Sequence, residues 1–330
     1  MCGGYVKRRQ YRGESQKTYR DHNNNMRQTT LSGRDLLAAG LIVLIWGTNF
    51  VAMKIGLRSF TPFQLGAARY LFAMLPLILL VRAPRLHWKW LLLYGLCQGV
   101  GQFGLLFVSL RIGMTAALAS VLLQTQMFFT ALFSFIVLAE RPGKPLLAGL
   151  GMAALGLACF AMNYLLPAAG AAAATTALGF ALCLAAASMW AASNIVVRLV
   201  QRAAPEFDAL SFLVWCSAVP VLPFVGLSLL FDAPASRWQW TAAPWQGWVA
   251  VAYLGWIATI FGYTMWTGLI KRHGANRIAP FGLGVPVVGL SSGMLFLGET
   301  ITGWQWAGIV LIVAALACVL FGGRLARPRR

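Results

Sequence analysis

Acidic side chains are scarce in this sequence, which has eight Asp and Glu residues among 330. None of them lies in the middle of a long apolar stretch; they are Glu14, Asp21, Asp35, Glu140, Glu206, Asp208, Asp232 and Glu299. A proton relay built on a carboxylate inside a membrane segment therefore has no candidate residue. Glu140 and Glu299 are expected instead to cap the helices that follow them, where a helix dipole stabilises a negative charge.

Histidine and clustered cysteine are also missing where chemistry would need them. The three histidines, His22, His87 and His273, belong to no HExxH motif. The six cysteines are scattered along the chain, with no CxxC pair among them. Neither a zinc site nor a disulfide framework is therefore indicated. We expect no metal, no cofactor and no enzymatic activity, because no catalytic set of residues is present.

Charged residues as a whole are rare, at 11% of the chain, whereas 59% of the residues are hydrophobic. A soluble domain has about 25% charged residues. Stretches of about 20 apolar residues predict membrane-spanning helices, and we expect ten of them, at 36–57, 62–81, 90–110, 115–138, 146–164, 176–197, 210–230, 246–269, 278–297 and 304–322. The predicted fold class is an all-α polytopic membrane protein with ten transmembrane helices.

The second half of the chain repeats the first. In the first half, an arginine, a glycine, a glutamate, a second glycine and a cysteine follow one another as Arg111, Gly113, Glu140, Gly149 and Cys159. The same order recurs as Arg272, Gly274, Glu299, Gly308 and Cys318. Each repeat holds five predicted spans, and an odd number inverts the second copy relative to the first. Inverted repeats are typical of secondary transporters. We expect a disordered tail at 1–34, repeats at 35–165 and 176–323, a linker at 166–175 and a basic tail at 324–330.

The net charge of +19 reflects membrane orientation rather than nucleic-acid binding. Of the 27 Lys and Arg residues, 22 fall in the tails and the loops on the same side, and only three in loops on the opposite side. By the positive-inside rule, both termini are expected in the cytoplasm of a bacterium, with the spans in its inner membrane and the basic loops near anionic lipid. The tail carries no signal peptide, and Met26 is an equally plausible start.

Polar side chains recur at helical spacing within several predicted spans. Trp46 and Asn49 share one face of the first span, and Trp190 and Asn194 share one face of the sixth. Such groups are expected to face the bundle interior or a water-filled cavity. The candidates for lining a solute path are Trp46, Asn49, Arg69, Gln98, Gln102, Gln124, Gln126, Trp190, Asn194 and Tyr263. Alternatively, any one of the amides could only bridge helices, a contact worth about 0.6 kcal/mol.

Arg69 is the basic residue placed deepest in a predicted span. It follows Pro62 by seven residues, which puts it about 10 Å into the hydrocarbon at about 1.5 Å per residue. It could contact a solute carboxylate, or it could pair with backbone carbonyls and helix ends for packing. Lys54 lies near a span end and is expected to reach the interface. Amides, aromatic rings and a cation together suit a small zwitterionic solute.

Residues 44–51 (Leu-Ile-Trp-Gly-Thr-Asn-Phe-Val) resemble the opening of EamA-type carriers of the drug/metabolite transporter superfamily. Arg69, Gly113 and the corners Glu140-Arg141 and Glu299-Thr300 resemble that family too. The runs at 120–124 and 284–290 are similar to members that release cysteine and O-acetylserine. The resemblance covers about residues 36–324.

This resemblance implies two EamA-type repeats and a secondary transporter that exports small amino acids or amino-acid metabolites by alternating access. Two alternatives stay open: an exporter of a different small metabolite or drug, and a passive channel, since channels are also built from inverted repeats. We expect a monomer or a homodimer in the bilayer.

Overall fold

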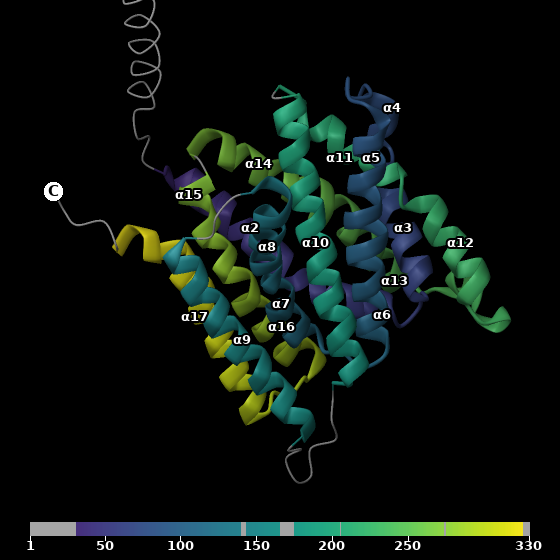
Figure 1. Ribbon diagram of the computed structural model, residues 1–330. Helices are drawn as coiled ribbons and strands as arrows, with labels where there is room; N and C mark the ends of the chain where they lie inside the picture. Colours follow the sequence, from purple (N-terminus) through teal and green to yellow (C-terminus); the bar gives the residue numbers. More distant parts are fainter. Residues whose placement is uncertain (1–30, 140–142, 166–174, 205, 274, 326–330) are drawn as a thin grey trace, which may run out of the picture.

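The computed structural model describes residues 31–139, 143–165, 175–204, 206–273 and 275–325, and these residues form helices and contain no strand (Figure 1). Several predictions lie outside the described residues. They concern most of the N-terminal tail, Glu140, most of the predicted linker and the last five residues.

Helices of the first half follow one another with short connections. They are α2 (Gly33–Gly56), α3 (Pro62–Met74), α4 (Leu77–Leu80), α5 (Trp88–Tyr94), the π-helix η1 (Gly95–Gly104), α6 (Leu105–Arg111), α7 (Ala116–Leu122), the 3-10 turn η2 (Leu123–Thr125), α8 (Gln126–Leu138) and α9 (Lys144–Leu165).

The second half has a similar order of elements. They are α10 (Ala177–Ala203), α11 (Ala209–Ala218), α12 (Val221–Phe231), the 3-10 turns η3 (Pro234–Ser236) and η4 (Gln239–Ala242), α13 (Trp245–Ala252), the π-helix η5 (Tyr253–Phe261), α14 (Gly262–His273), α15 (Ala275–Ile278), the 3-10 turn η6 (Ala279–Leu283), α16 (Gly284–Leu297) and α17 (Gly303–Leu325).

Local sequence explains where the first two long helices begin. Ser32 and Asp35 form a reciprocal capping box at the start of α2. Thr61 and Gln64 form another at the start of α3, with Pro62 in the first helical turn. Each box satisfies backbone N–H groups that the helix itself leaves unpaired. The start of each of these two helices is therefore set by two or three residues.

Nine stretches of the described residues are long and apolar enough to cross a membrane. The predicted span 304–322 lies in α17, where the apolar helix at Gly303–Val319 is shorter than the others. The ten-span prediction is thus met for nine, and the inversion of the repeats stays a prediction. The seventh predicted span is interrupted at Pro220, because α11 ends at Ala218 and α12 begins at Val221.

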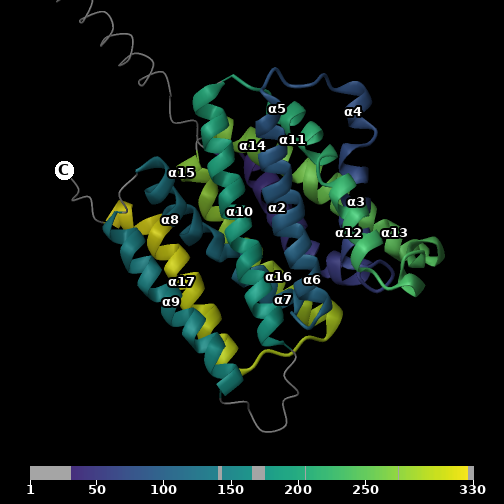
Figure 2. The same cartoon turned by 45° about the vertical axis from the view of Figure 1, so that its right-hand side comes forward.

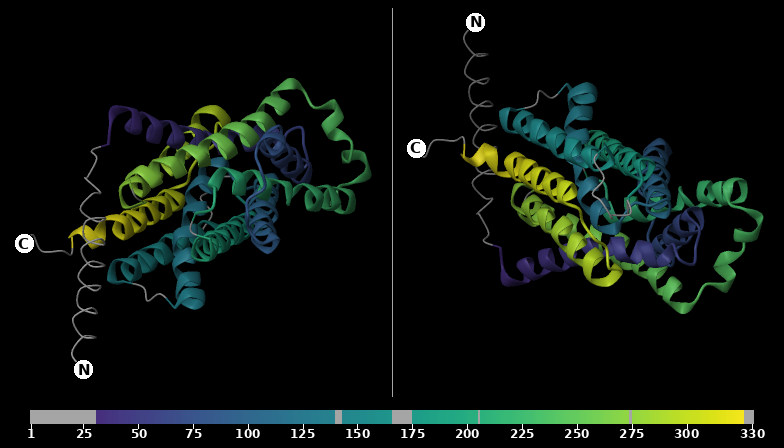
Figure 3. Two further views of the ribbon diagram at one scale, coloured as in Figure 1. Left: turned by 90° about the horizontal axis from the view of Figure 1, so that it is seen from above. Right: turned by 90° about the horizontal axis from the view of Figure 1, so that it is seen from below.

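Helices from the two halves pack against each other. α9 and α17 lie side by side along one edge of the bundle in three orientations (Figures 1, 2 and 3). Glycines permit this approach: a Cβ on Gly156 would lie 3.0 Å from the Gly308 carbonyl oxygen, and a Cβ on Gly308 would lie 2.9 Å from that of Gly156. Gly156 and Gly308 therefore allow the last helices of the two halves to pack closely.

Candidate functional site: a cavity beside Arg69

A cavity of about 500 Å³ lies among helices of both halves. Walls come from α2, α3, η1 and the α7–α8 region of the first half, and from α10, α11, η5, α14 and the start of α16 in the second. The volume falls within the range of small-molecule pockets, about 300–1,000 Å³. The structure places nine of the ten sequence candidates in this wall: Trp46, Asn49, Arg69, Gln102, Gln124, Gln126, Trp190, Asn194 and Tyr263.

Gln98 is the candidate that the main cavity does not include. It lines an adjoining cavity of about 20 Å³ instead. Its Nε2 donates to the Tyr263 hydroxyl at 3.2 Å, and its Oε1 accepts from Ser193. Gln98 therefore donates to Tyr263 from outside the main cavity, and its amide oxygen is occupied by Ser193.

Arg69 lies in the cavity wall and is only 1% exposed. Its Nη2 donates to Thr259 Oγ1 at 3.0 Å, and its guanidinium carbon lies 3.7 Å from the centroid of the Phe103 ring. A desolvated cation over an aromatic face gains about 2 kcal/mol or more. Nε and Nη1 have no hydrogen-bond partner among the described residues. The predicted pairing with backbone carbonyls or helix ends is therefore not what holds Arg69.

Close helix packing brings Arg69 and its partner together. Gly255 in η5 faces the Arg69 carbonyl oxygen, to which a Cβ would approach within 2.8 Å. The helix can approach there because glycine has no Cβ. One turn further along η5, Thr259 then reaches the guanidinium. The π-helices η1 and η5 carry Gln102 and Thr259 respectively, in keeping with the association of such segments with functional sites.

Aromatic rings form a second part of the wall. Trp46 lies 5.1 Å from Tyr263 and 5.3 Å from Trp266, measured between ring centroids. The Trp46 Nε1 donates to the Ala258 carbonyl at 3.0 Å. Ala258 precedes Thr259, the partner of Arg69, so the aromatic group and the cation are fixed to neighbouring residues of η5.

Three of the predicted amide side chains in the wall are engaged in contacts between helices. Asn194 Nδ2 donates to Gln126 Oε1 at 2.7 Å and to Thr130 Oγ1 at 3.2 Å. Gln124 Nε2 donates to the Gly282 carbonyl at 3.2 Å. These three amides therefore bridge α8 to α10 and η2 to η6, as the alternative interpretation of the sequence allowed.

Two other amides differ from these. Asn49 is 7% exposed and Gln102 is 2% exposed. Asn49 Oδ1 and Gln102 Oε1 have no hydrogen-bond partner within the described part of the chain. A buried acceptor without a donor costs about 1–3 kcal/mol. The residues with unsatisfied acceptors therefore line the same cavity as Arg69, which has unsatisfied donors.

Sequence reasoning missed some residues that shape the site. Phe103, which stacks on Arg69, follows the predicted Gln102 directly, but nothing in the sequence distinguishes its ring from other phenylalanines. Thr259 precedes the predicted Tyr263 by one helical turn, but nothing in the sequence pairs it with Arg69. Gln201 and Phe207, near the end of α10 and in the following turn, also line the cavity. Gln201 is exposed, so the cavity reaches the surface at this end.

The opposite end of the bundle, here named the Glu299 end, is tied together by Lys54, Arg111, Glu299 and the start of α7. Glu299 accepts from the backbone N–H groups of Ala116 and Ala117, each at 2.7 Å. The prediction that it caps the following helix is wrong, because it caps α7 of the other half. Its carboxylate lies beside two N–H groups that α7 leaves unpaired.

Two basic residues complete the Glu299 end. Lys54 Nζ donates to the Leu110 carbonyl at 2.8 Å, and Arg111 Nη1 donates to the Leu57 carbonyl at 2.9 Å. A basic side chain near the end of each helix, α2 and α6, therefore donates to a backbone carbonyl at the end of the other. Lys54 was expected to reach the interface, and the structure instead places its ammonium on a helix end within the protein.

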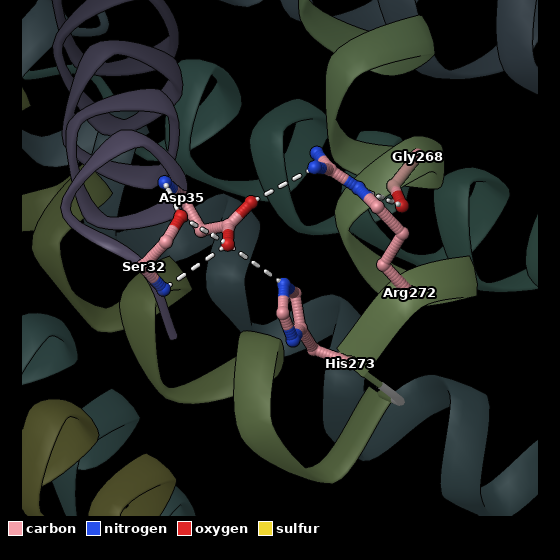
Figure 4. A network of polar contacts seen from close by, with 5 residues as sticks. All are labelled: Ser32, Asp35, Gly268, Arg272 and His273. Atoms are coloured by element: carbon pink, nitrogen blue, oxygen red, sulfur yellow. Dashed lines mark hydrogen bonds and ion pairs between the residues drawn. The ribbon is translucent and has the colours of Figure 1, made fainter. Parts of the chain in front are cut away.

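The end that contains the cavity mouth, here named the Asp35 end, has a different polar cluster. Asp35 Oδ1 lies 2.9 Å from Arg272 Nη1, and Asp35 Oδ2 lies 3.1 Å from His273 Nε2 (Figure 4). The same carboxylate accepts from Ser32 in the capping box. This cluster ties the start of α2 to the end of α14.

Comparison with known proteins places this arrangement among transporters. Residues 34–162 and 177–321 each match the model of the EamA-like transporter family. The chain is 38% identical over 301 residues to a probable amino-acid metabolite efflux pump of Salmonella typhimurium, covering 91% of this chain and 99% of that protein. A probable amino-acid metabolite efflux pump of Escherichia coli is 36% identical over 295 residues, covering 89% and 97% respectively.

One crystal structure of another protein supports the fold. It superposes with a TM-score of 0.58 at 20% sequence identity, covering 88% of this chain and 98% of the other.

Proposed function

The chain belongs to the EamA-like transporter family, and on that premise we propose that it exports small zwitterionic amino-acid metabolites by alternating access. Nine apolar helices in the described residues are long enough to span a membrane, and the relatives from Salmonella and Escherichia are named as probable efflux pumps. Cysteine and O-acetylserine represent the proposed substrate class.

Arg69 is the observation that carries this proposal. A cation buried to 1% exposure with two unpaired nitrogens is costly. Phe103 and Thr259 offset only part of that cost. A carboxylate in the cavity supplies the acceptor that the guanidinium lacks, and such charge-assisted bonds contribute about 1.5–3 kcal/mol.

The direction of transport follows from the predicted orientation. The basic loops assign the Asp35 end, with Gln201 and Phe207 at the cavity mouth, to the cytoplasm. A solute in the cytoplasm then has access to Arg69, whereas the Glu299 end separates it from the outside. This is the arrangement in which an exporter is loaded.

The test is counterflow in proteoliposomes with labelled O-acetylserine or cysteine as substrate. Arg69→Gln should weaken binding of the free acids by about 10- to 100-fold, because one charge-assisted contact is lost. Arg69→Lys should retain partial activity, since the charge stays while the planar fork is lost. Methyl esters lack the carboxylate, so they should compete weakly in the wild type and change little in Arg69→Gln.

Arg198→Gln is the matched control, because Arg198 is exposed on α10 outside the cavity wall and donates to Ser134 Oγ at 2.6 Å. It should alter free acids and esters alike. Esters that compete as well as acids in the wild type would contradict carboxylate contact and favour a different metabolite or a drug as substrate. Flux without saturation or counterflow would favour the passive channel.

A further inference from the structure

Asn49 and Gln102 share a property that Gln126, in the same wall, lacks. Both side chains are at least nine-tenths buried, and both present an oxygen without a donor. Gln126, in the same wall, uses its oxygen to accept from Asn194 and Thr130. A fully buried amide oxygen without a donor is thus found at Asn49 and Gln102 among the wall amides that the structure describes.

These two oxygens lie on the elements that hold the cation. Gln102 precedes Phe103, the ring on which Arg69 stacks. Asn49 follows Trp46 by one helical turn, and Trp46 is hydrogen-bonded to Ala258, which adjoins the Arg69 partner Thr259. The residues that carry the free acceptors and the free donors, Asn49, Gln102 and Arg69, therefore line one cavity.

No Asp or Glu lines the cavity within the described residues. A ligand group that carries several donors and a positive charge would have to be bound by neutral oxygens and aromatic faces. A primary ammonium has three donors, and the Trp46 and Tyr263 rings offer π faces to a cation.

We propose that Asn49 Oδ1 and Gln102 Oε1 form the ammonium subsite of the solute cavity, opposite in charge preference to Arg69. This inference rests on the proposed function, in which Arg69 takes the carboxylate. The two subsites together select a free α-amino acid. Because the ammonium is held by neutral oxygens, a second cationic group on the solute gains no partner here and is repelled by Arg69.

O-acetylserine and N-acetylserine are the probes that isolate the amine. They are isomers that share the carboxylate and the acetyl group, and only O-acetylserine has a free ammonium. The assay is competition against labelled cysteine in proteoliposomes, at mildly acidic pH and short times so that acyl transfer between the isomers is negligible. In the wild type, O-acetylserine should compete about tenfold better or more, the expected effect of one charged hydrogen bond.

The variants are Asn49→Leu and Gln102→Leu, which keep the approximate volume and remove the oxygen. In each, the ratio of the two inhibition constants should fall toward one. Gln126→Leu is the matched control, because its oxygen already has protein partners, and it should leave the ratio unchanged. The ratio is measured within one preparation, so a lower yield of folded protein does not affect it.

Failure of this inference and failure of the proposed function give different results. Equal competition by the two isomers in the wild type, with methyl esters still weak, would overturn the ammonium subsite and leave the carboxylate contact standing. A wild-type preference that survives in both leucine variants would also overturn it. If neither isomer competes with a substrate that is nevertheless transported, the proposed substrate class itself is wrong.

Discussion

The two ends of the helix bundle use their charged residues in different ways. At the Glu299 end, Glu299, Lys54 and Arg111 are bonded to the backbone of helix ends. At the Asp35 end, Asp35 contacts the Arg272 and His273 side chains (Figure 4), and the cavity reaches the surface at Gln201. Charges bonded to helix ends hold whole helices together, whereas a contact between two side chains can be replaced by other contacts at lower cost in free energy. We therefore expect the Glu299 end to determine whether the cavity is closed to the outside.

The largest effect expected is on accessibility at the two ends. In a variant without native cysteines, Arg58→Cys, exposed near the Glu299 end, should react in intact cells with a thiol reagent that cannot cross membranes. Gln201→Cys, at the cavity mouth, should react only in inverted vesicles. Mass spectrometry or gel-shift labelling measures both. The reverse pattern would contradict the predicted orientation and with it the export direction.

Glu299→Gln should have the next largest effect. The change replaces a carboxylate that accepts from two backbone N–H groups, and each charged bond contributes about 1.5–3 kcal/mol. We expect transport to fall about tenfold or more, and Met53→Cys, buried on α2 within the cavity wall, to become reactive from outside.

The control for this change is Glu206→Gln, since Glu206 is exposed near the Asp35 end. It should leave both transport and labelling of Met53→Cys near the values of the unaltered chain. If Glu299→Gln behaves like this control, the capping of α7 does not contribute to closure, and the comparison of the two ends loses its physical basis.

Lys54→Met should have a smaller effect of the same kind. It removes a donor to the Leu110 carbonyl but keeps most of the apolar stem that packs beside it. A net contribution of about 1 kcal/mol corresponds to about a fivefold loss of transport. Arg111→Met should cost less, because Arg111 is exposed. Initial rates per reconstituted protein measure both, and a loss as large as that of Glu299→Gln would place the main contact at Lys54.

Much of the fold could be predicted from the sequence because it depends on local patterns. Apolar length predicted nine of the spans that the described residues contain. Helical spacing grouped Trp46 with Asn49, and both line the cavity. Each of these properties depends on residues within one segment of the chain, so it can be predicted without knowing which segments are neighbours in the fold.

What could not be predicted is which helix faces which. Arg69 and Thr259 are 190 residues apart, and Glu299 and Ala116 are 183 apart. Spacing along Glu299's own segment favoured the next helix as its partner, whereas packing of α16 on α7 decided the outcome. For the same reason, the sequence could not separate Gln126, whose oxygen is paired, from Gln102, whose oxygen is not.

Asp35→Asn is the weakest change and the one that best sharpens the comparison. The Arg272 side chain in this contact is 60% exposed, and exposed ion pairs contribute little because water and salt screen them. The asparagine also retains a side-chain oxygen for the cap at Ser32. We expect transport within about twofold of the wild type and unchanged outside labelling of Met53→Cys, with His273→Gln as the companion variant on the same contact. A loss as severe as that of Glu299→Gln would mean that the Asp35 cluster also determines closure, so the two ends would differ in geometry and not in the strength of their contacts.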